Sequence, residues 1–420
     1  MKKLKLILIL IVGLSFEIQA QELDVNLQLR PRFEYRNGYK QPLLYGQEGT
    51  SQISQRSRLG INYKQEDLIV KLTLQNTRTW GDVPSTTTAD KNGVAVFEAW
   101  AQYNFTEKWS ARMGRQVLSY DNQRILGELD WAQQGQSHDA LTVSYHDKSQ
   151  KLDFGGAYNS NAENLVQTPY NVANMYKTMQ YAWYHNQFSE NLGASFLLLN
   201  TGYEYANADA KLLVDYKQTF GPYLTYKTGK LDTSFWLYGQ TGKSTDLQVS
   251  AWNAAANLGY QITDTFKAGL GYEFLSGKSS NDGSTVIKSF NPLFGTNHGL
   301  NGYMDYFYVG NYTNSFGLQD AFIKLNYNVN KWQFALIPHI FLTAADVVTP
   351  VNEKLDSYLG TEVDATFGYN FKKNITVTGG YSQMFGSKTM EFVKGGDTSH
   401  TNNWAWLMIS VDPKIFSWKK

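Results

Sequence analysis

The stretch LDVNLQLRPRFEYR, residues 23–36, carries two alternating rows of side chains. Its odd positions are apolar or aromatic, and its even positions are polar and mostly charged. A β-strand sends successive side chains to opposite faces, so this segment has one apolar face and one charged face. A soluble sandwich would bury the apolar face in its core, whereas a membrane barrel turns it to lipid and lets the charged face line water.

Composition narrows the choice. The chain has 420 residues, no cysteine, and a formal net charge of +1 from 38 basic and 37 acidic side chains. This balance argues against a nucleic-acid-binding protein, and the lack of cysteine excludes disulfides and cysteine-based metal or nucleophile chemistry. Glycine (35) and aromatic residues (15%) are plentiful while proline (9) is scarce, which suits many long strands with an aromatic belt.

Residues 1–20 have the layout of a secretory signal peptide. Lys2, Lys3 and Lys5 precede the apolar run 6–14, and a small residue, Ala20, ends the segment. No later stretch approaches the ~20 apolar residues that a transmembrane helix needs. No Pro/Ser-rich linker divides the remainder, so we expect one domain over residues 21–420.

Alternating segments recur along the whole chain, and we expect an all-β fold: a transmembrane antiparallel barrel of about 18 strands. The predicted strands are 22–36, 50–63, 67–81, 93–105, 108–119, 139–146, 150–159, 177–188, 191–204, 209–227, 230–243, 247–262, 265–278, 315–328, 331–345, 355–371, 374–389 and 402–416.

The connections between these segments alternate between short and long. In seven of the eight tight turns the preceding strand ends close to an aromatic residue: Tyr63, Phe105, Tyr145, Phe188, Tyr226, Tyr327 and Phe371. Rings at one common height are typical of a bilayer interface. The other connections are longer, notably 120–138, 160–176, 279–314 and 390–401. We therefore predict short periplasmic turns, long extracellular loops and a bacterial outer-membrane location rather than a soluble β protein.

The arginines give the clearest signal of a site. All nine lie in the first third of the chain: Arg30, Arg32, Arg36, Arg56, Arg58, Arg78, Arg112, Arg115 and Arg124. Consecutive strands are neighbours in such a barrel, so the arginines form a strip on one arc of the wall. Alternation points Arg30, Arg32, Arg56 and Arg58 inward, and Arg112 shares that parity. Arg115 then needs a bulge or a position above the membrane.

A guanidinium stays ionised and matches a carboxylate with two hydrogen bonds, so this strip favours anionic solutes. Inward acids are expected near the strip and on later strands: Glu34, Glu98, Glu273, Asp320, Glu362 and Asp364. A basic arc and an acidic arc would set a transverse field across the lumen. The alternative is that these are the scattered charges of any water-filled barrel and imply no selectivity.

Two stretches, residues 110–140 and 290–307, resemble the alginate-export family of outer-membrane porins. The matching residues of the first are Gly114, Arg115, Gln116, Tyr120, Asp121, Arg124, Gly127, Asp130, Trp131, Gln134, Gly135 and Asp139. Those of the second are Phe290, Asn291, Pro292, Leu293, Thr296, Asn297 and His298. The resemblance implies a monomeric outer-membrane pore with a basic constriction for anionic polysaccharide such as alginate. It adds Arg124 and Asp130 to the pore-lining candidates.

The long connection 279–314 is expected to fold into the mouth, where its rings would narrow the pore and stack on sugars. The candidates are Phe290, Asn297, His298, Tyr303 and Tyr306. The alternative is an ordered surface loop packed on its own aromatic residues.

Catalysis is not expected. The six histidines show no His-x-x-x-His or His-Glu-x-x-His spacing, and we predict no metal site and no cofactor. The sequence thus predicts an outer-membrane channel for anionic small molecules or polysaccharide, in contact with lipid and without a nucleic-acid partner. A general, weakly selective uptake porin and an outer-membrane enzyme or adhesin acting through its loops are the alternatives.

Overall fold

The computed structural model describes residues 21–86, 90–296 and 298–420. The predicted signal peptide, residues 1–20, lies outside the described residues. The elements are β1 (Gln21–Asn37), β2 (Thr50–Gln65), β3 (Leu68–Thr79), β4 (Ala95–Asn104), β5 (Trp109–Gln116), β6 (His138–His146), β7 (Gln150–Tyr158), β8 (Thr178–Gln187), β9 (Leu192–Ala206), β10 (Leu212–Thr228), β11 (Leu231–Ser244), β12 (Leu247–Gln261), β13 (Phe266–Leu275), β14 (Leu318–Val329), β15 (Trp332–Leu342), β16 (Tyr358–Lys372), β17 (Ile375–Gly386), α2 (Lys388–Lys394), β18 (Asn402–Val411) and β19 (Lys414–Lys419). Within these ranges no helix is long and apolar enough to cross a membrane.

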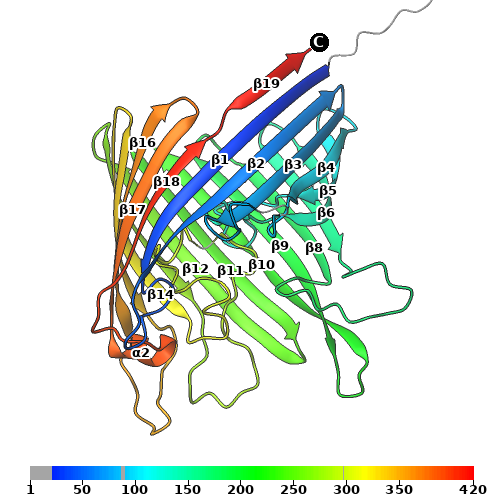
Figure 1. Ribbon diagram of the computed structural model, residues 1–420. Coiled ribbons are helices and arrows are strands. Elements are labelled where there is room, and N and C mark those ends of the chain that lie inside the picture. The colour runs from blue at the N-terminus through cyan, green and yellow to red at the C-terminus, as the bar shows by residue number, and fades with distance from the viewer. Residues whose placement is uncertain (1–20, 87–89, 297) are drawn as a thin grey trace, which may run out of the picture.

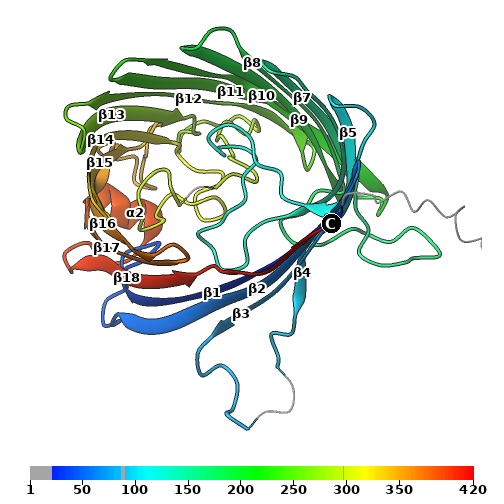
Figure 2. The ribbon, with the colours of Figure 1, turned by 90° about the horizontal axis from the view of Figure 1, so that it is seen from above.

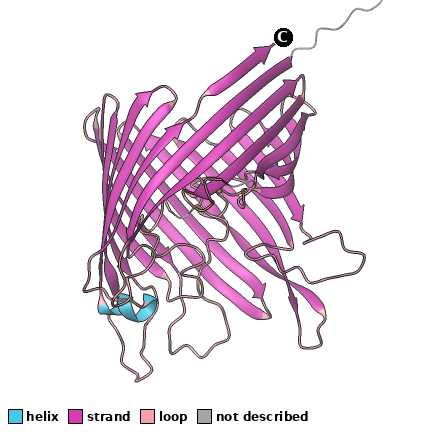
Figure 3. Ribbon diagram, in the orientation of Figure 1, coloured by secondary structure: helices cyan, strands magenta, loops and turns pink. Residues whose placement is uncertain are grey.

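The strands form one closed antiparallel barrel (Figures 1 and 3). Each strand from β1 to β17 pairs with the next, and β1 pairs with β2 on one side and with both β18 and β19 on the other. β18 and β19 are successive parts of one strand, interrupted at Pro413, whose carbonyl accepts a hydrogen bond from the Leu27 N–H at 3.0 Å. The nineteen strand elements of the sheet therefore make an eighteen-stranded barrel, as the sequence predicts.

The two rows of residues 23–36 face opposite sides of the wall. Leu27 and Phe33 are each 41% exposed on the outside, whereas Arg30 and Glu34, at 4% and 0%, point inward. Exposed rings also gather near the short turns on the outer face, and they include Phe105, Trp109, Phe188, Tyr226, Tyr327, Trp332 and Phe371. The apolar skin and its aromatic belt are the surface that a bilayer requires.

The two rims differ. One rim carries the tight turns together with the start of β1 and the end of β19, and the other carries the long connections and α2 (Figure 1). We call them the short-turn rim and the long-loop rim. The sequence predicted strand up to residue 389, but α2 begins at Lys388. The Ser387 side chain accepts a hydrogen bond from the Met390 N–H at 3.2 Å, which caps the helix and ends the strand.

Two long connections, 117–137 and 276–317, fold into the barrel, where the view along its axis shows coil inside the ring of strands (Figure 2). They bring Leu126, Phe294 and Tyr306 into an apolar cluster with Met179 and Leu199, which belong to the wall strands β8 and β9. Period-two alternation does not reveal such a cluster, because both rows of β9 are apolar at LLL, residues 197–199. The bore is therefore partly filled by protein.

Candidate functional site

Inward arginines stand side by side on β1 and β2. Arg30 lies directly opposite Arg56 in the sheet register, and Arg58 lies opposite Gln28. Arg30, Arg32 and Arg56 are buried, while the Arg58 side chain is 14% exposed, so all four point inward as the alternation predicts. Like charges directly opposite each other destabilise a sheet, so this strip requires acceptors.

Asp130, carried into the lumen by loop 117–137, supplies the main acceptor. Its carboxylate accepts from Arg30 Nη1 at 3.1 Å and from Arg56 Nη2 at 2.8 Å, and it lies 3.9 Å from Arg58 Nη1. Its backbone carbonyl accepts from Arg30 Nη2 at 2.8 Å. Three guanidinium groups thus converge on a single carboxylate. We call Arg30, Arg56 and Arg58, together with the position of the carboxylate that they surround, the Asp130 seat.

The electrostatics of Asp130 follow from this seat. Burial alone would raise the pKa of its carboxyl, but the charges of Arg56 and Arg30 and the hydrogen bond from Arg56 outweigh it and hold the pKa below its usual range. The carboxylate therefore stays ionised at neutral pH. Its side chain is nevertheless 51% exposed, so the seat is open to the lumen on one side.

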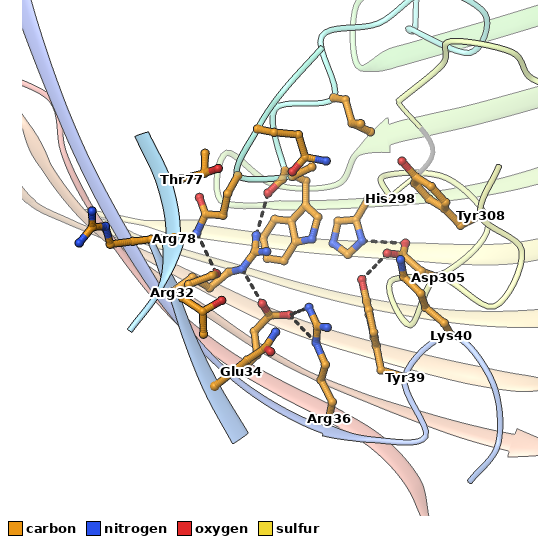
Figure 4. Close-up of a pocket in the computed structure, with 18 of the residues that line it drawn as sticks. Arg32, Glu34, Arg36, Tyr39, Lys40, Thr77, Arg78, His298, Asp305 and Tyr308 are labelled. Carbon is orange, nitrogen blue, oxygen red and sulfur yellow. Dashed lines mark hydrogen bonds and ion pairs between the residues drawn. The ribbon is translucent and has the colours of Figure 1, made fainter. Parts of the chain in front are cut away.

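An aromatic stack continues the site across the lumen. The Arg32 guanidinium lies 4.0 Å from the ring centroid of Trp131, and the Trp131 ring is stacked on His298 at 4.2 Å. His298 Nδ1 hydrogen-bonds to Asp305 at 2.9 Å, and the Tyr39 hydroxyl donates to the same carboxylate (Figure 4). Burial and the Asp305 charge raise the pKa of Tyr39 well above its ordinary value, so its hydroxyl remains a donor.

A cavity of about 470 Å³ adjoins this stack near the long-loop rim (Figure 4). It is lined by basic side chains from β1, β3 and the β1–β2 loop, namely Arg32, Arg36, Lys40 and Arg78. Acidic side chains face the same space, and Glu34 accepts hydrogen bonds from both Arg32 and Arg36 at 3.1 and 3.0 Å. The cavity is thus basic, but part of its charge is already compensated.

Other predicted residues take different places. Arg112 points inward, donates to Gln102 at 2.8 and 3.0 Å and lies over Trp100, at 4.3 Å. Glu98 is inward and forms an ion pair with Lys71 at 2.5 Å. Both line the bore near the strip but outside the Asp130 seat.

The prediction that Arg115 lines the pore is wrong. In β5 the inward positions are even, since Gln116 is buried and Met113 is 70% exposed. Arg115 therefore faces outward at the long-loop end of the strand, where it pairs with Asp139 at 2.8 Å. Without a bulge that shifts the register, the parity of the strand decides its face.

Arg124 lies inside the barrel but joins the acidic arc rather than the arginine strip. It is buried, forms an ion pair with Glu273 at 2.8 Å, and donates to Asn301 at 2.7 Å. The predicted inward acids Glu273, Asp320, Glu362 and Asp364 are all buried on β13, β14 and β16. His339 lies among them and hydrogen-bonds to Asp320 at 2.8 Å. Two arcs of opposite charge therefore share the lumen.

The candidate constriction residues of loop 276–317 are brought inside the barrel, but not all can meet a solute. Phe290 and Tyr306 are buried in the apolar cluster, and the Tyr306 hydroxyl donates to the Gly38 carbonyl at 2.8 Å. They have no face free for stacking, which corrects that expectation. His298 and Tyr303 lie near each other, with ring centroids 5.3 Å apart, and Asn297 lies outside the described residues.

Sequence reasoning gave no role to Trp131 or Gln133, which anchor the loop to the strip. Gln133 accepts from Arg30 Nη2 at 3.2 Å and donates to Ser54 at 3.0 Å. Trp131 was among the residues that carry the family resemblance, and the signal for Gln133 was its place near Asp130 in the loop. Among the described residues no cluster of histidine and acidic side chains could hold a metal ion.

The family model for alginate export matches residues 21–390. The chain belongs to the alginate export family. The resemblance drawn from residues 110–140 and 290–307 is thereby confirmed. A search of curated proteins finds no match.

The alginate export fold of this chain is shared with solved outer-membrane porins. OccAB4 of Acinetobacter baumannii is 11% identical, with a TM-score of 0.64 over 95% of this chain and 98% of that chain. OccK9 (OpdG) of Pseudomonas aeruginosa is 12% identical, with a TM-score of 0.62 over 95% and 98%. OpdK of the same organism, in a structure with vanillate, is 12% identical, with a TM-score of 0.59 over 94% and 99%. This member of the family is an outer-membrane channel, not an enzyme.

Proposed function

We propose that the protein is a passive channel for anionic solutes, from small carboxylates to uronate polysaccharide such as alginate. The observation that carries the proposal is the seat of Asp130, where Arg30, Arg56 and Arg58 surround one carboxylate. A carboxylate on a solute offers the same two oxygens to the same guanidinium groups. In this proposal a passing anion is stabilised where the loop carboxylate lies in the structure.

The site has donors beyond those that the loop satisfies. Among the described residues Arg58 Nη2 is buried without a hydrogen-bond partner, and the Arg36 side chain, which is 31% exposed, lines the neighbouring cavity. A passing anion can therefore be bound by Arg36 while Asp130 stays in place, and Arg58 Nη2 becomes available when the loop shifts. Conduction requires binding that is favourable enough for entry and weak enough for release, and several partly compensated sites in a row meet that condition.

The proposal includes an orientation. The short-turn rim faces the periplasm and the long-loop rim faces the outside, as in bacterial barrels with this asymmetry, and the barrel works as a monomer. The OpdK structure with vanillate, which is a carboxylate, adds support at the level of the fold.

A general, weakly selective porin is the second candidate. It is favoured by the compensation of Arg32 and Arg36 by Glu34 and by the buried acids of β13, β14 and β16. In that case the inward charges keep the bore wet and confer no preference. The two candidates differ in their ion selectivity.

The test is the reversal potential of the purified barrel in a planar bilayer under a salt gradient. We expect preference for the anion, and we expect oligomannuronate and oligoguluronate to block the salt current. Arg30→Ala together with Arg58→Ala should weaken both effects. A cation preference would exclude anion selectivity, and block that ignores the two substitutions would separate the arginine strip from transport.

A further inference from the structure

A second cavity, of about 490 Å³, lies between loop residues 299–303 and the wall strands β11 to β15. Asp232, Lys267 and Asn328 line it, and each lies next to a tight turn, so the cavity belongs to the short-turn side of the lumen. No residue that lines it also lines the cavity beside Arg36. Its volume is in the range of about 300–1,000 Å³ that small-molecule sites occupy.

The sheet register explains why space opens here. In the inward row that crosses β12, β13 and β14, Gly259 lies opposite Gly269, which lies opposite Lys324. The Asp232–Lys267 ion pair covers Gly259, but only backbone lies close to Gly269, so the wall is recessed at Gly269, directly opposite Lys324. In the next row Phe322 lies across Gly271, where an added Cβ would overlap with its ring.

The charges of this cavity are compensated except at one residue. Asp232 pairs with Lys267 at 2.5 Å, Glu273 with Arg124 at 2.8 Å, and Asp320 with His339 at 2.8 Å. Lys324 makes no hydrogen bond or ion pair with the residues that the structure describes. Lys324 is therefore the cation of this cavity that has no paired carboxylate among the described residues, although it lies on β14 with Asp320 of the acidic arc.

A second unpaired group belongs to Asn257, which also lines the cavity and whose Oδ1 lies beside Gly271 and the Phe322 ring. Asn257 donates to Ser234 at 3.1 Å, but its Oδ1 is buried and has no partner among the described residues. A buried amide oxygen of this kind favours a hydroxyl donor. The cavity therefore combines three groups: the Lys324 ammonium suits a carboxylate, the Asn257 oxygen suits a hydroxyl, and the Phe322 ring suits the apolar face of a sugar.

We propose that this cavity is a second binding site of the channel, for a sugar-acid residue. Lys324 binds its carboxylate, Asn257 Oδ1 accepts from a hydroxyl, and the ring packs against Phe322. The inference rests on the proposed function, since it assumes that carboxylated solutes enter the lumen. A solute then meets one site on each side of the two inward loops.

The test is block of the salt current by a mannuronate trimer added to one side of the bilayer at a time. Wild-type protein should show two blocking dissociation constants, one for each side. Lys324→Gln should weaken block from the short-turn side by about tenfold, the loss expected for one charged hydrogen bond, and leave block from the other side unchanged. Lys324→Arg should restore block from the short-turn side. Maltotriose has no carboxylate, so any block that it causes should be the same in wild type and in Lys324→Gln.

Lys331→Gln is the matched control, because it removes the same charge from the tight turn of the same hairpin outside the cavity. Heat-modifiable migration on gels verifies that each variant is folded. If the trimer blocks from neither side, the proposed function fails as well. Two results would overturn the second site and leave the anion channel standing. One is block by the trimer that depends on Arg58 but not on Lys324. The other is block by maltotriose that Lys324→Gln weakens as much as block by the trimer.

Discussion

Trp131 and His298 stack face to face inside the barrel, with ring centroids 4.2 Å apart and planes inclined by 9°. They lie on different inward loops, 117–137 and 276–317, which are far apart in the sequence. Arg32 lies over the Trp131 ring, and Asp305 holds the His298 ring by a hydrogen bond. The stack therefore ties both loops to β1.

We expect this contact to contribute measurable coupling. A double-mutant cycle of Trp131→Ala and His298→Ala should give a coupling energy of about 0.5–1.5 kcal/mol in denaturant unfolding of the detergent-solubilised barrel. Each single variant should also increase fluctuations of the single-channel current, because a loop loses an anchor. Trp252→Ala, which removes an exposed ring from the outer face, should leave the current unchanged. Additive effects would mean that the two loops are held independently.

Asp130→Asn keeps the shape of the side chain but removes its charge from among three arginines. The anion-to-cation permeability ratio should rise by about fivefold, equivalent to about 1 kcal/mol. The reversal potential under a salt gradient measures it. Asp264→Asn removes an equal charge from a tight turn and should have no effect. Equal shifts in the two variants would argue against the seat.

The same carboxylate makes a pH prediction. The net effect of its neighbours lowers the folded-state pKa of Asp130 below its ordinary value of 3.8. Its ion pairs are then fully formed above that value and are lost as the pH falls through the folded pKa. Current fluctuations should stay constant from pH 7 to about 4 and rise in more acidic solution. Asp130→Asn should show no such step; an identical step in this variant would assign it to another group.

Arg115 and Arg58 form a matched pair of arginines on opposite faces of the wall. Arg58→Gln should reduce anion preference by about twofold to fivefold, since the group lies 3.9 Å from the Asp130 carboxylate and partly faces the lumen. Arg115→Gln should leave the reversal potential unchanged, because its partner is the outward Asp139. A shift of equal size in Arg115→Gln would contradict the assigned face.

Gly302 allows loop 276–317 to approach β16. Its φ is +83°, and an added Cβ would lie 2.7 Å from Glu362 Oε1. Gly302→Ala should lower the free energy of unfolding by about 2 kcal/mol or more, of which about 1 kcal/mol comes from the left-handed backbone. Gly310→Ala supplies the control, since its φ is +90° and its surroundings are open. Equal losses in the two variants would show that the approach to Glu362 does not matter.

The wall of the barrel could be predicted from the sequence because the face of each side chain depends only on its position within its own strand. Alternation over residues 23–36 sets the face of every side chain, and the turn residues mark where each strand ends. The same rule decides that Arg115 faces outward once its strand parity is fixed. The arginine strip follows directly from it.

The contents of the bore could not be predicted in the same way. Loop 117–137 returns to β1 through contacts about a hundred positions apart in the sequence, such as Arg30 with Asp130, and no periodicity encodes them. Burial of Phe290 and Tyr306 depends on which wall residues they meet. Lys324 stands out only when the partners of its neighbouring acids are known.

The junction of the first and last strands has a further consequence. Trp131 lies against Arg32 of β1 and against Trp404 and Trp406 of β18, so one loop residue bridges the two ends of the sheet from within. Parting of β1 from β18 would break the ladder and uncover this residue at once. The loop therefore resists lateral opening of the barrel, because separation of the two strands would also cost the contacts that this residue makes with both of them.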